Sequence, residues 1–538
     1  MSRLSAHAAV EGEAPMENDT IPRAGESPSR LARSVAILLD PSRRNGMIIV
    51  ALALGVVVLH LGVPGLIPSG ADGGNWLALA KRGLGTDAMS AETSYPPLFL
   101  ALLGALLLLL DPILALTASA LIAKTALVVG VYWCTRTLGY GYATVTAAVV
   151  AVAGAQVEAY AWGGYPQLLA TGIGLLAVFF LVRYLEDETR LHLWLGITGS
   201  ILASSTHLLI GGLLPFVLLL AAIHRLYLAD ADRTEWIDGL KKALLVALPG
   251  LLLFLVFWWM SARLGVEPVV NPISLDRFAG LRSIVRDAPI PWLLITLTAV
   301  GAALWPHWPG AKGRTVSVGT SWAAAGLGFF LITGEPRSLL LTQVGIALLA
   351  VVVIEAMFNR LRSRARSHDS MTSHRMAYRG MLILLISILS AIAAGGLSAY
   401  VNATNWYRVV DTPEINALRS LEMASEPGDL VIASKGHHGS PVGWWVEGYA
   451  ERPTYTGVSV DFVAFEEERD QAEIANEVFS GQLSDSQIRS KLEAIGADFL
   501  LLDRRGPDAP WLRGSFAQSL TVLYDSATLV IFRVPETG

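Results

Sequence analysis

The first residue that could carry out chemistry is a carboxylate, Asp72, in the stretch IPSGADGGNW at residues 67–76. It follows directly after an apolar run, MIIVALALGVVVLHLGVPGL, and small residues surround it. A carboxylate can take a proton from a reacting hydroxyl group, and a positioned base accelerates reactions on the order of 10²- to 10⁴-fold. It can also cap a helix, here one beginning at Gly73, because its oxygen satisfies free backbone N–H groups. Asp72 is therefore a candidate for catalysis, for capping, or for both.

Two cations could act together with this acid. Lys124 lies well inside an apolar segment, where a charged side chain costs roughly 2.5–3.5 kcal/mol on insertion scales, so we expect it to have a partner or a role. Alternatively, Lys124 extends its ammonium group toward the membrane interface. Arg337 follows Pro336, which fits the first turn of a helix. We expect Arg337 at a helix start, where it binds a phosphate, meets lipid headgroups in general or pairs with Glu335.

Membrane-spanning helices must position these residues. The chain has 538 residues, of which 53% are hydrophobic and 16% charged, and its mean hydropathy is +0.50. A chain of this length and composition is predicted to be a polytopic α-helical protein of the lipid bilayer. The net charge of -5 indicates no particular partner, and we expect no nucleic acid. A single cysteine, Cys134, excludes an intrachain disulfide.

A span needs about 20 apolar residues, because a hydrocarbon layer of ~30 Å is crossed at ~1.5 Å per residue. In the segment at 95–112, the apolar stretch between the prolines and Asp111 is too short for a span. We therefore interpret this segment as a juxtamembrane helix. The predicted spans number eleven and lie near 47–66, 114–135, 141–159, 166–185, 191–206, 208–227, 240–260, 290–305, 317–333, 336–357 and 380–400.

Basic residues predict how these spans are oriented, since Lys and Arg are enriched in short cytoplasmic loops. With a cytoplasmic N-terminus, Arg136 and the basic cluster at 359–379 both fall on the cytoplasmic side. We therefore expect a disordered cytoplasmic tail at 1–35 and a transmembrane domain at 36–400 in the plasma membrane. Asp72 and residues 401–538 would then be extracytoplasmic.

From about residue 401 the composition changes. PGDLVIAS, ADFLLLD and ATLVIFRV are typical of short buried strands, whereas VAFEEERDQAEIANEVFSG and DSQIRSKLEAIG are typical of amphipathic helices bounded by glycine. These segments predict a small α/β domain at 401–538.

In their order, these parts resemble the GT-C superfamily of integral membrane glycosyltransferases, which take sugars from polyprenyl-phosphate carriers. The resemblance includes distant similarity to protein mannosyltransferases and to oligosaccharyltransferase catalytic subunits. It rests on Asp72 after the first span, YPPL at 95–98, the cationic span at 123–140, GYPQLLATGIGLLAVFFLVRYL, STHLLIGGLLPF and the late GEPRSLLLTQVGIALL. It implies a GT-C-like membrane domain that moves a sugar from a polyprenyl-phosphate donor to an extracytoplasmic glycan, lipid or protein acceptor.

The resemblance also implies roles for single residues. Asp72 would be the general base on the acceptor, and Lys124 and Arg337 would bind the carrier phosphate, where fixed positive charge stabilises the leaving oxyanion. Glu92 lies where some members of the superfamily carry a second acid, although a solvated loop carboxylate is the simpler interpretation. No cofactor is certain. A divalent metal is left open, because no DxD motif is evident and the histidines lack metal-ligand spacing.

Other candidate site residues lie in the segment VEAYAWGGYPQ and just after it: Glu158, Tyr165 and His207. The pattern favours Tyr160, Trp162 and Tyr165 as an aromatic belt at the membrane interface over a sugar platform. His207 fits a structural hydrogen bond at a helix start as well as it fits a site.

The C-terminal segment GWWVEGYAERPTYTG at 443–457 looks like the WWDYG region of oligosaccharyltransferases, which reads the acceptor. Val446 and Glu447 depart from that motif, which puts protein N-glycosylation in doubt. Trp444, Trp445 and Tyr449 could face an acceptor, but packing within the α/β core is the favoured use of two adjacent tryptophans.

Two other classes of function are alternatives to sugar transfer. A transporter or flippase of lipid-linked sugars is disfavoured, because transporters tend to show repeated halves and none is visible here. A non-catalytic scaffold would leave Asp72, Lys124 and Arg337 dispersed, whereas an enzyme would bring them to one cavity.

Overall fold

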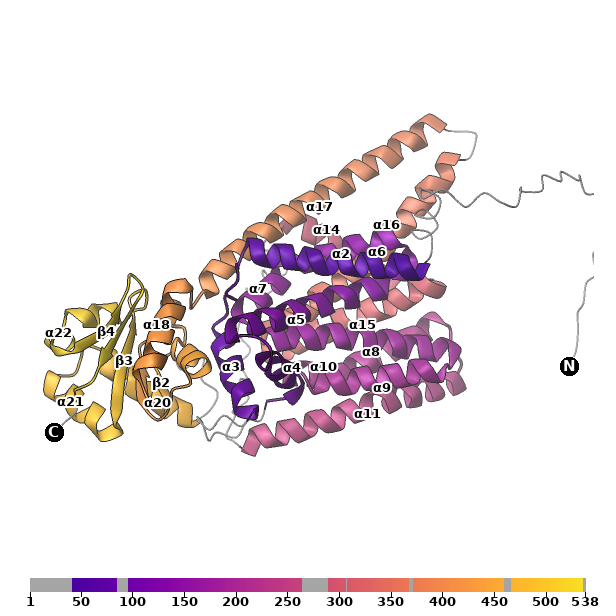
Figure 1. Cartoon of the computed structure of the whole chain (residues 1–538). Coiled ribbons are helices and arrows are strands. Elements are labelled where there is room, and N and C mark those ends of the chain that lie inside the picture. The colour runs from indigo at the N-terminus through magenta and orange to yellow at the C-terminus, as the bar shows by residue number, and fades with distance from the viewer. Residues whose placement is uncertain are drawn as a thin grey trace, which may run out of the picture. The chain divides into compact units, whose positions relative to one another are not determined.

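The computed structural model describes residues 41–84, 95–263, 289–305, 307–366, 371–458 and 466–535. The predicted tail at 1–35 and Glu92 lie outside these ranges. Tertiary contacts divide the chain into a short unit, Met1–Val50, and a compact unit, Ala51–Gly538. All contacts described below lie within the second unit, which is mainly helical and carries one small sheet (Figure 1).

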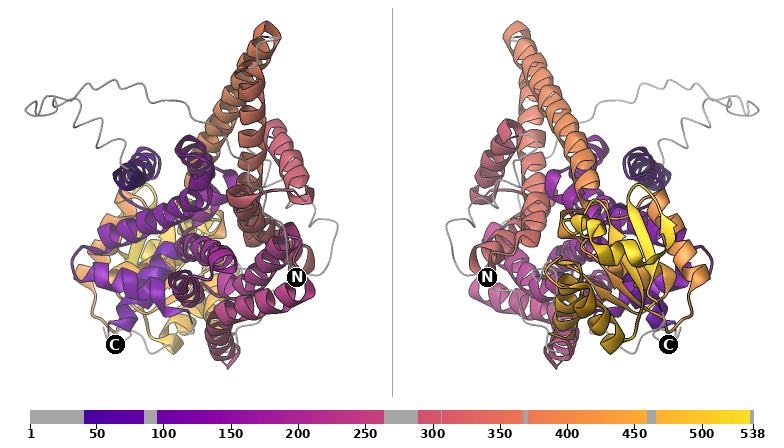
Figure 2. Two further views of the ribbon diagram at one scale, coloured as in Figure 1. Left: turned by 90° about the vertical axis from the view of Figure 1, so that its right-hand side faces the viewer. Right: turned by 90° about the vertical axis from the view of Figure 1, so that its left-hand side faces the viewer.

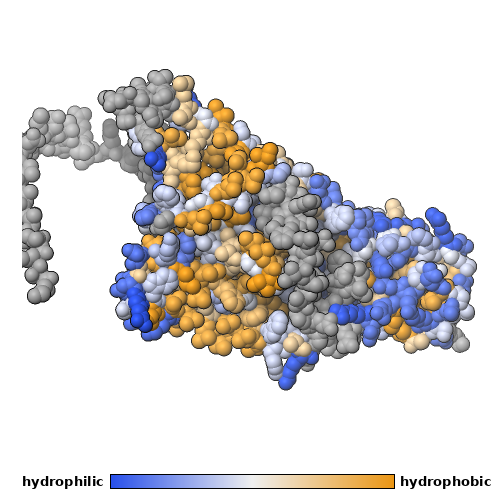
Figure 3. All heavy atoms as spheres, turned by 180° about the vertical axis from the view of Figure 1, so that it is seen from behind, coloured by the Kyte–Doolittle hydropathy of each residue, from blue (hydrophilic) through white to orange (hydrophobic). Residues whose placement is uncertain are grey.

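Apolar helices make up most of the chain. In the described residues, eight helices are long and apolar enough to cross a membrane, or nine if one bent pair counts as a single span. Apolar side chains also cover much of the surface of the helical part, whereas the part with the sheet is largely hydrophilic (Figure 3). The protein is thus a polytopic helical membrane protein. The helices are α2 (Pro41–Gly62), α5 (Pro112–Thr135), α6 (Tyr140–Ala151), α7 (Gly154–Trp162), α8 (Tyr165–Asp187), α9 (Arg190–Ser204), α10 (Leu208–Leu228), α11 (Arg233–Arg263), α14 (Pro289–Leu304), α15 (Gly310–Thr333), α16 (Leu339–Arg366) and α17 (Met371–Tyr407).

The predicted number of eleven spans stays a prediction. Each predicted segment contains a helix, but α9 and α14 have only 15 and 16 residues. Two further short helices are α3 (Asp72–Gly83) and α4 (Pro97–Leu107). At 11 residues α4 is too short to cross the hydrocarbon layer, in agreement with the juxtamembrane interpretation of 95–112.

The segment 141–159, predicted as one span, is broken in the structure. It consists of α6 and α7, which meet at an angle of 50°. Helix α17 packs on this break at Gly396, where a Cβ atom would lie 2.1 Å from the carbonyl oxygen of Val152. Glycine therefore permits this contact between two backbones. Beyond the break, α7 carries Glu158, Tyr160 and Trp162. Helices α16 and α17 also lie side by side, as both views in Figure 2 show.

The C-terminal sheet has the strand order β2-β1-β3-β5-β4. Strands β1 (Leu430–Ala433), β2 (Thr454–Thr456) and β3 (Ala497–Asp503) are parallel, and β5 (Leu529–Arg533) pairs antiparallel with β3 and with β4 (Thr521–Asp525). Helices α18 (Thr412–Ala424), α20 (Glu466–Phe479), α21 (Asp485–Ile495) and α22 (Ser515–Ser519) accompany the sheet. The three predicted strands and two predicted helices are confirmed, while β2 and β4 were not predicted.

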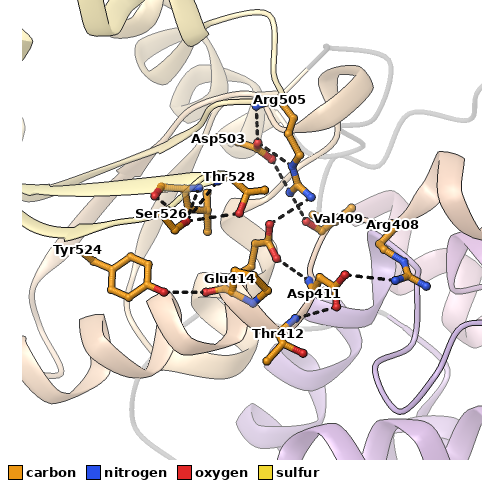
Figure 4. A network of polar contacts seen from close by, with 12 residues as sticks. Arg408, Val409, Asp411, Thr412, Glu414, Asp503, Arg505, Tyr524, Ser526 and Thr528 are labelled. Atoms are coloured by element: carbon orange, nitrogen blue, oxygen red, sulfur yellow. Dashed lines mark hydrogen bonds and ion pairs between the residues drawn. The ribbon is translucent and has the colours of Figure 1, made fainter.

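A polar network joins the end of α17 to this sheet (Figure 4). The guanidinium group of Arg505 contacts the buried carboxylates of Asp503 and Glu414 at 2.9 and 3.2 Å. It also donates a hydrogen bond of 2.7 Å to the carbonyl oxygen of Val409. Because both carboxylates are buried, this arginine is the charge that balances them. The network holds the start of α18 at the carboxyl end of β3.

Candidate functional site

Asp72 is the first residue of α3 and lies against the turn that ends α7. That turn is made by Gly163, whose φ of 103° favours glycine and whose Cβ, if present, would lie 3.0 Å from the Cβ of Asp72. Trp76 Nε1 donates a hydrogen bond of 2.7 Å to the carbonyl oxygen of Gly163. Ser69 Oγ donates one of 3.0 Å to that of Ala161. These two bonds hold both flanks of Asp72 on residues 161–163.

The capping role predicted for Asp72 is wrong. The helix begins at Asp72 itself, its N-cap is Ala71, and no side chain caps it. Asp72 is half-buried, and this burial raises the pKa of its carboxyl group to about 6, although the positive charge of Arg337 opposes the rise. A carboxylate with this pKa is ionised at neutral pH and only weakly stabilised, as suits a general base.

Arg337 lies in η2 (Pro336–Ser338), a single turn that leads into α16. Its position at a helix start after Pro336 agrees with the prediction. Glu335 caps this turn by accepting a hydrogen bond of 3.1 Å from the backbone N–H of Arg337. The guanidinium Nε lies 3.6 Å from the same carboxylate, and the group stands over the ring of Trp162, 5.4 Å from its centroid. The side chain is 53% exposed, so the guanidinium remains accessible to an anion.

An aromatic wall lies next to Asp72 and consists of Trp76, Tyr95, Phe99 and His207. The ring of Tyr95 lies 4.7 Å from that of Trp76 and 6.2 Å from that of His207. Phe99 of α4 meets the other edge of Trp76 at 5.9 Å. These three contacts bring α3, α4 and the start of α10 together around the site. Tyr95 also lies close enough to Asp72 and Arg337 for both charges to affect its pKa.

His207 belongs to this wall. It is the N-cap of α10, but its side chain makes no capping hydrogen bond, so the predicted structural hydrogen bond at the helix start is absent. Burial, together with a smaller effect of the charge of Arg337, lowers the pKa of His207 to about 3. The imidazole is therefore neutral at physiological pH.

Lys124 has different surroundings from Arg337. Its side chain is only 1% exposed, so it does not extend to the membrane interface, and that alternative is wrong. The ammonium nitrogen lies 4.5 Å from the ring centroid of Tyr160 and 4.1 Å from that of Tyr400. Each such contact is worth about 2 kcal/mol when desolvated, so the two together offset the roughly 2.5–3.5 kcal/mol cost of a cation within a span.

The tyrosines around Lys124 link it to the site. Tyr160 lies 5.4 Å from Tyr165, measured between ring centroids, and its hydroxyl group shares a hydrogen bond of 2.7 Å with His60. Tyr165 in turn interacts electrostatically with Asp72. Tyr160 and Tyr165 are buried, so the prediction of an aromatic belt facing the lipid is wrong for both. They form an inner layer behind Asp72.

Glu158 is linked to Trp162 through Tyr407. It accepts a hydrogen bond of 3.2 Å from the hydroxyl group of Tyr407, and the ring of Tyr407 meets that of Trp162 at 6.4 Å. Because Trp162 also contacts Arg337, Glu158 is connected to the site through two aromatic side chains.

The tryptophan pair of the C-terminal domain packs directly on α3. A Cβ atom on Gly73 would lie 2.8 Å from the ring of Trp445, and one on Gly74 would lie 2.5 Å from the backbone carbonyl of Trp444. Trp445 is fully buried. The helix of Asp72 is thus a partner of this ring, in addition to the sheet that the favoured prediction named.

The other end of α3 contacts the same segment through two pairs of polar side chains. Lys81 contacts Glu451 at 2.5 Å, and Arg82 contacts Glu447 at 3.6 Å. Burial raises the pKa of Glu447 to about 8 despite the charge of Arg82. Both carboxylates lie in or next to η5 (Val446–Ala450), a π-helical turn. The hydroxyl group of Tyr449 accepts a hydrogen bond of 3.2 Å from Arg419. The ring of Tyr449 is mostly buried and packs against its neighbours.

The structure thus groups Asp72, Arg337, His207, Tyr95 and Tyr165, while Lys124 lies in the layer behind them. Tyr95 and Trp76 were not predicted as site residues. A signal for Trp76 was present, because it follows Asp72 by four positions and a helix places such residues on one face. Within the described ranges, no group of three His, Cys, Asp or Glu side chains could hold a metal ion.

Comparisons with known proteins do not assign a function to this site. No family model matches the chain, and a search of curated proteins finds no match.

Proposed function

We propose that the protein is a membrane glycosyltransferase of GT-C type, which moves a sugar from a polyprenyl-phosphate donor to an acceptor hydroxyl group. The observation that carries the proposal is that Asp72 and Arg337, which are far apart in the sequence, meet the same turn: Asp72 lies against Gly163, and the guanidinium of Arg337 stands over the ring of Trp162. An acid and an accessible guanidinium at one turn suit a reaction that removes a proton from one group and releases a phosphate from another.

In the proposed reaction, Asp72 takes the proton of the acceptor hydroxyl group as its oxygen attacks the anomeric carbon of the sugar. The bond between that carbon and the phosphate oxygen breaks, and its electron pair leaves with the polyprenyl phosphate. Arg337 stabilises the developing charge, because a guanidinium can donate two parallel hydrogen bonds to a phosphate. Aromatic side chains such as Trp162 offer surfaces for the sugar ring between the two charges.

Two assignments follow from the contacts. Lys124 is given a supporting role, since it contacts Tyr160 and Tyr400 and not the group around Arg337. The segment with Trp444 and Trp445 is given the role of holding α3, so acceptor contacts would come from residues next to it. The site and the C-terminal domain are proposed to face the extracytoplasmic side, which a phosphatase fusion at Gly538 would test.

The deciding experiment uses purified protein in vesicles with a panel of radiolabelled polyprenyl-phosphate sugars. The parent should transfer at least one sugar, and Asp72→Asn should lower the rate by about two orders of magnitude, as expected when a general base is removed. Glu493→Gln, an exposed acid on α21, is the matched control. Equal transfer by Asp72→Asn and the parent would exclude Asp72 as the base, and an absence of transfer from every donor would favour a transporter or a scaffold.

A further inference from the structure

Two cavities lie next to each other among the membrane helices, away from the site around Asp72. The first, here called the polar cavity, has a volume of about 360 Å³, and Lys312, Glu355 and His307 are among the residues that line it. The second, the apolar cavity, has a volume of about 380 Å³ and lies between α6, α14, α16 and α17. Ligand pockets measure roughly 300–1,000 Å³, so each is large enough to hold part of a ligand. None of the described residues that line them belongs to the site around Asp72.

The two cavities share a border on two elements. Between α5 and α6, Leu138 lines the polar cavity and the next residue, Gly139, lines the apolar cavity. On α16, Val351 lines the apolar cavity and Glu355 lines the polar cavity. Residues four positions apart lie on the same face of a helix, so one face of α16 leads from one cavity to the other. A polar chamber therefore continues directly into an apolar one.

An ion pair forms one wall of the polar cavity. Lys312 Nζ lies 2.7 Å from Glu355 Oε2, and Asn359 Nδ2 donates a hydrogen bond to the other oxygen of this carboxylate. The side chain of Lys312 is 29% exposed, and an ammonium group has three N–H donors whereas a carboxylate has about four acceptor sites. Both charges can therefore bind a further group. Ala311 and Lys312 also belong to the first turn of α15, which no side chain caps, and such a turn favours an anion.

The apolar cavity suits a hydrocarbon chain. Its walls consist almost entirely of apolar side chains such as Trp292 and Ile295, and the hydroxyl group of Thr146 donates its hydrogen bond of 2.8 Å within α6, to the carbonyl oxygen of Tyr142. Water finds few partners on such walls, whereas a hydrocarbon chain gains dispersion contacts with them. Val145 in the wall is 43% exposed, so the cavity is open to a chain from the surrounding lipid.

We propose that the two cavities together bind one phospholipid of the surrounding bilayer, with a headgroup that carries a phosphate and a primary amine, as in phosphatidylethanolamine. The phosphate accepts hydrogen bonds from Lys312 and the first turn of α15, the amine donates to Glu355, and one acyl chain fills the apolar cavity. A headgroup with both charges matches an ion pair that has both, whereas an anionic headgroup without an amine is repelled by Glu355. This inference does not rest on the proposed function.

The test uses the purified full chain, delipidated in detergent, with dioleoyl phosphatidylethanolamine as the probe. Native mass spectrometry over a range of lipid concentrations gives the affinity. The parent should bind this lipid about tenfold more tightly than dioleoyl phosphatidylcholine, whose quaternary amine cannot donate a hydrogen bond to Glu355. It should also bind it at least about tenfold more tightly than glycerophosphoethanolamine, which has the same headgroup and no acyl chain.

Gly141→Leu tests the apolar cavity. Gly141 lines this cavity, and an added Cβ would meet nothing within 4 Å, so the leucine side chain enters open space and occupies the place of the acyl chain. Affinity for phosphatidylethanolamine should fall by about tenfold, which corresponds to about 1.4 kcal/mol. The matched control is Gly55→Leu in α2, where an added Cβ also meets nothing within 4 Å, and it should bind the lipid as the parent does.

The double variant Lys312→Gln with Glu355→Gln tests the polar cavity, because it removes both charges and keeps two polar side chains side by side. It should lose the preference for phosphatidylethanolamine over phosphatidylcholine. Lys491→Gln with Glu477→Gln, which removes an ion pair of the C-terminal domain, should keep that preference. The proposal is overturned if Gly141→Leu binds phosphatidylethanolamine as tightly as the parent, or if the parent binds both lipids equally. Sugar transfer enters none of these measurements, so their failure would leave the proposed function untouched.

Discussion

Trp76 Nε1 lies 2.7 Å from the carbonyl oxygen of Gly163 and donates a hydrogen bond to it. This bond joins α3 to the turn after α7, where Asp72 lies against Gly163, the neighbour of Trp162. Because Arg337 stands over Trp162, the same bond sets the position of the acid relative to the guanidinium. The catalytic geometry that we propose therefore depends on the indole of Trp76.

The pH dependence of transfer should follow Asp72. Burial raises the pKa of its carboxyl group from 3.8 to about 6, and a general base acts in its ionised form. The transfer rate should therefore rise with pH, reach half of its limit near pH 6 and level off above pH 7. Rates measured from pH 4.5 to 8.5 would show this inflection, and the residual activity of Asp72→Asn should lack it. An inflection retained in Asp72→Asn would assign the titration to another group.

Arg337→Lys should weaken the apparent affinity for the donor by about tenfold or more, because an ammonium cannot reproduce two parallel hydrogen bonds to a phosphate. Acceptor affinity should change little. Initial rates over a grid of donor and acceptor concentrations separate these effects. If Arg337→Lys and Arg337→Ala both gave parental rates at every donor concentration, the only role of Arg337 would be its pairing with Glu335.

Gly448→Ala should destabilise the contact between η5 and α3. The added Cβ would lie 2.1 Å from the carbonyl oxygen of Gly74 and 2.9 Å from the Cβ of Leu77, so one of the two backbones must move. Overpacking of this kind costs about 1–3 kcal/mol, and α3 carries Asp72. We expect a lower thermal midpoint in detergent together with slower transfer.

The matched control for that variant is Gly428→Ala, where an added Cβ would meet nothing within 4 Å. It should leave the thermal midpoint and the transfer rate at parental values. If Gly448→Ala behaved as this control does, the tight packing of α3 on η5 would have no role in holding the site.

Lys124→Met should leave the affinity for undecaprenyl phosphate within about threefold of the parent, less than 1 kcal/mol. The ammonium group is enclosed by Tyr160 and Tyr400, and a methionine of similar length fills the same space. Binding of the labelled lipid to the purified variant is the measurement, with Arg337→Ala as the comparison that loses affinity. A tenfold loss in Lys124→Met would mean that this lysine reaches the phosphate directly.

The sequence by itself determined the local elements of this protein. Apolar runs located the helices, Pro336 marked the start of the turn that carries Arg337, and the shortness of 95–112 predicted α4. The segments ADFLLLD and ATLVIFRV were also found as strands. Each of these features depends on the hydropathy and backbone preferences of neighbouring residues, which a single segment contains in full.

Only the tertiary structure decided which surfaces meet. The bend between α6 and α7 is accompanied by the packing of Gly396 from α17, and the ring of Trp445 packs on α3 at Gly73. Tyr160 and Tyr165 turned inward because their partners, His60, Lys124 and Tyr400, come from helices far away in the chain. The packing of Tyr95 on Trp76 and His207 has the same origin. Such contacts join residues that no local pattern relates, so hydropathy and spacing could name the two charges but not the aromatic side chains that pack near Asp72.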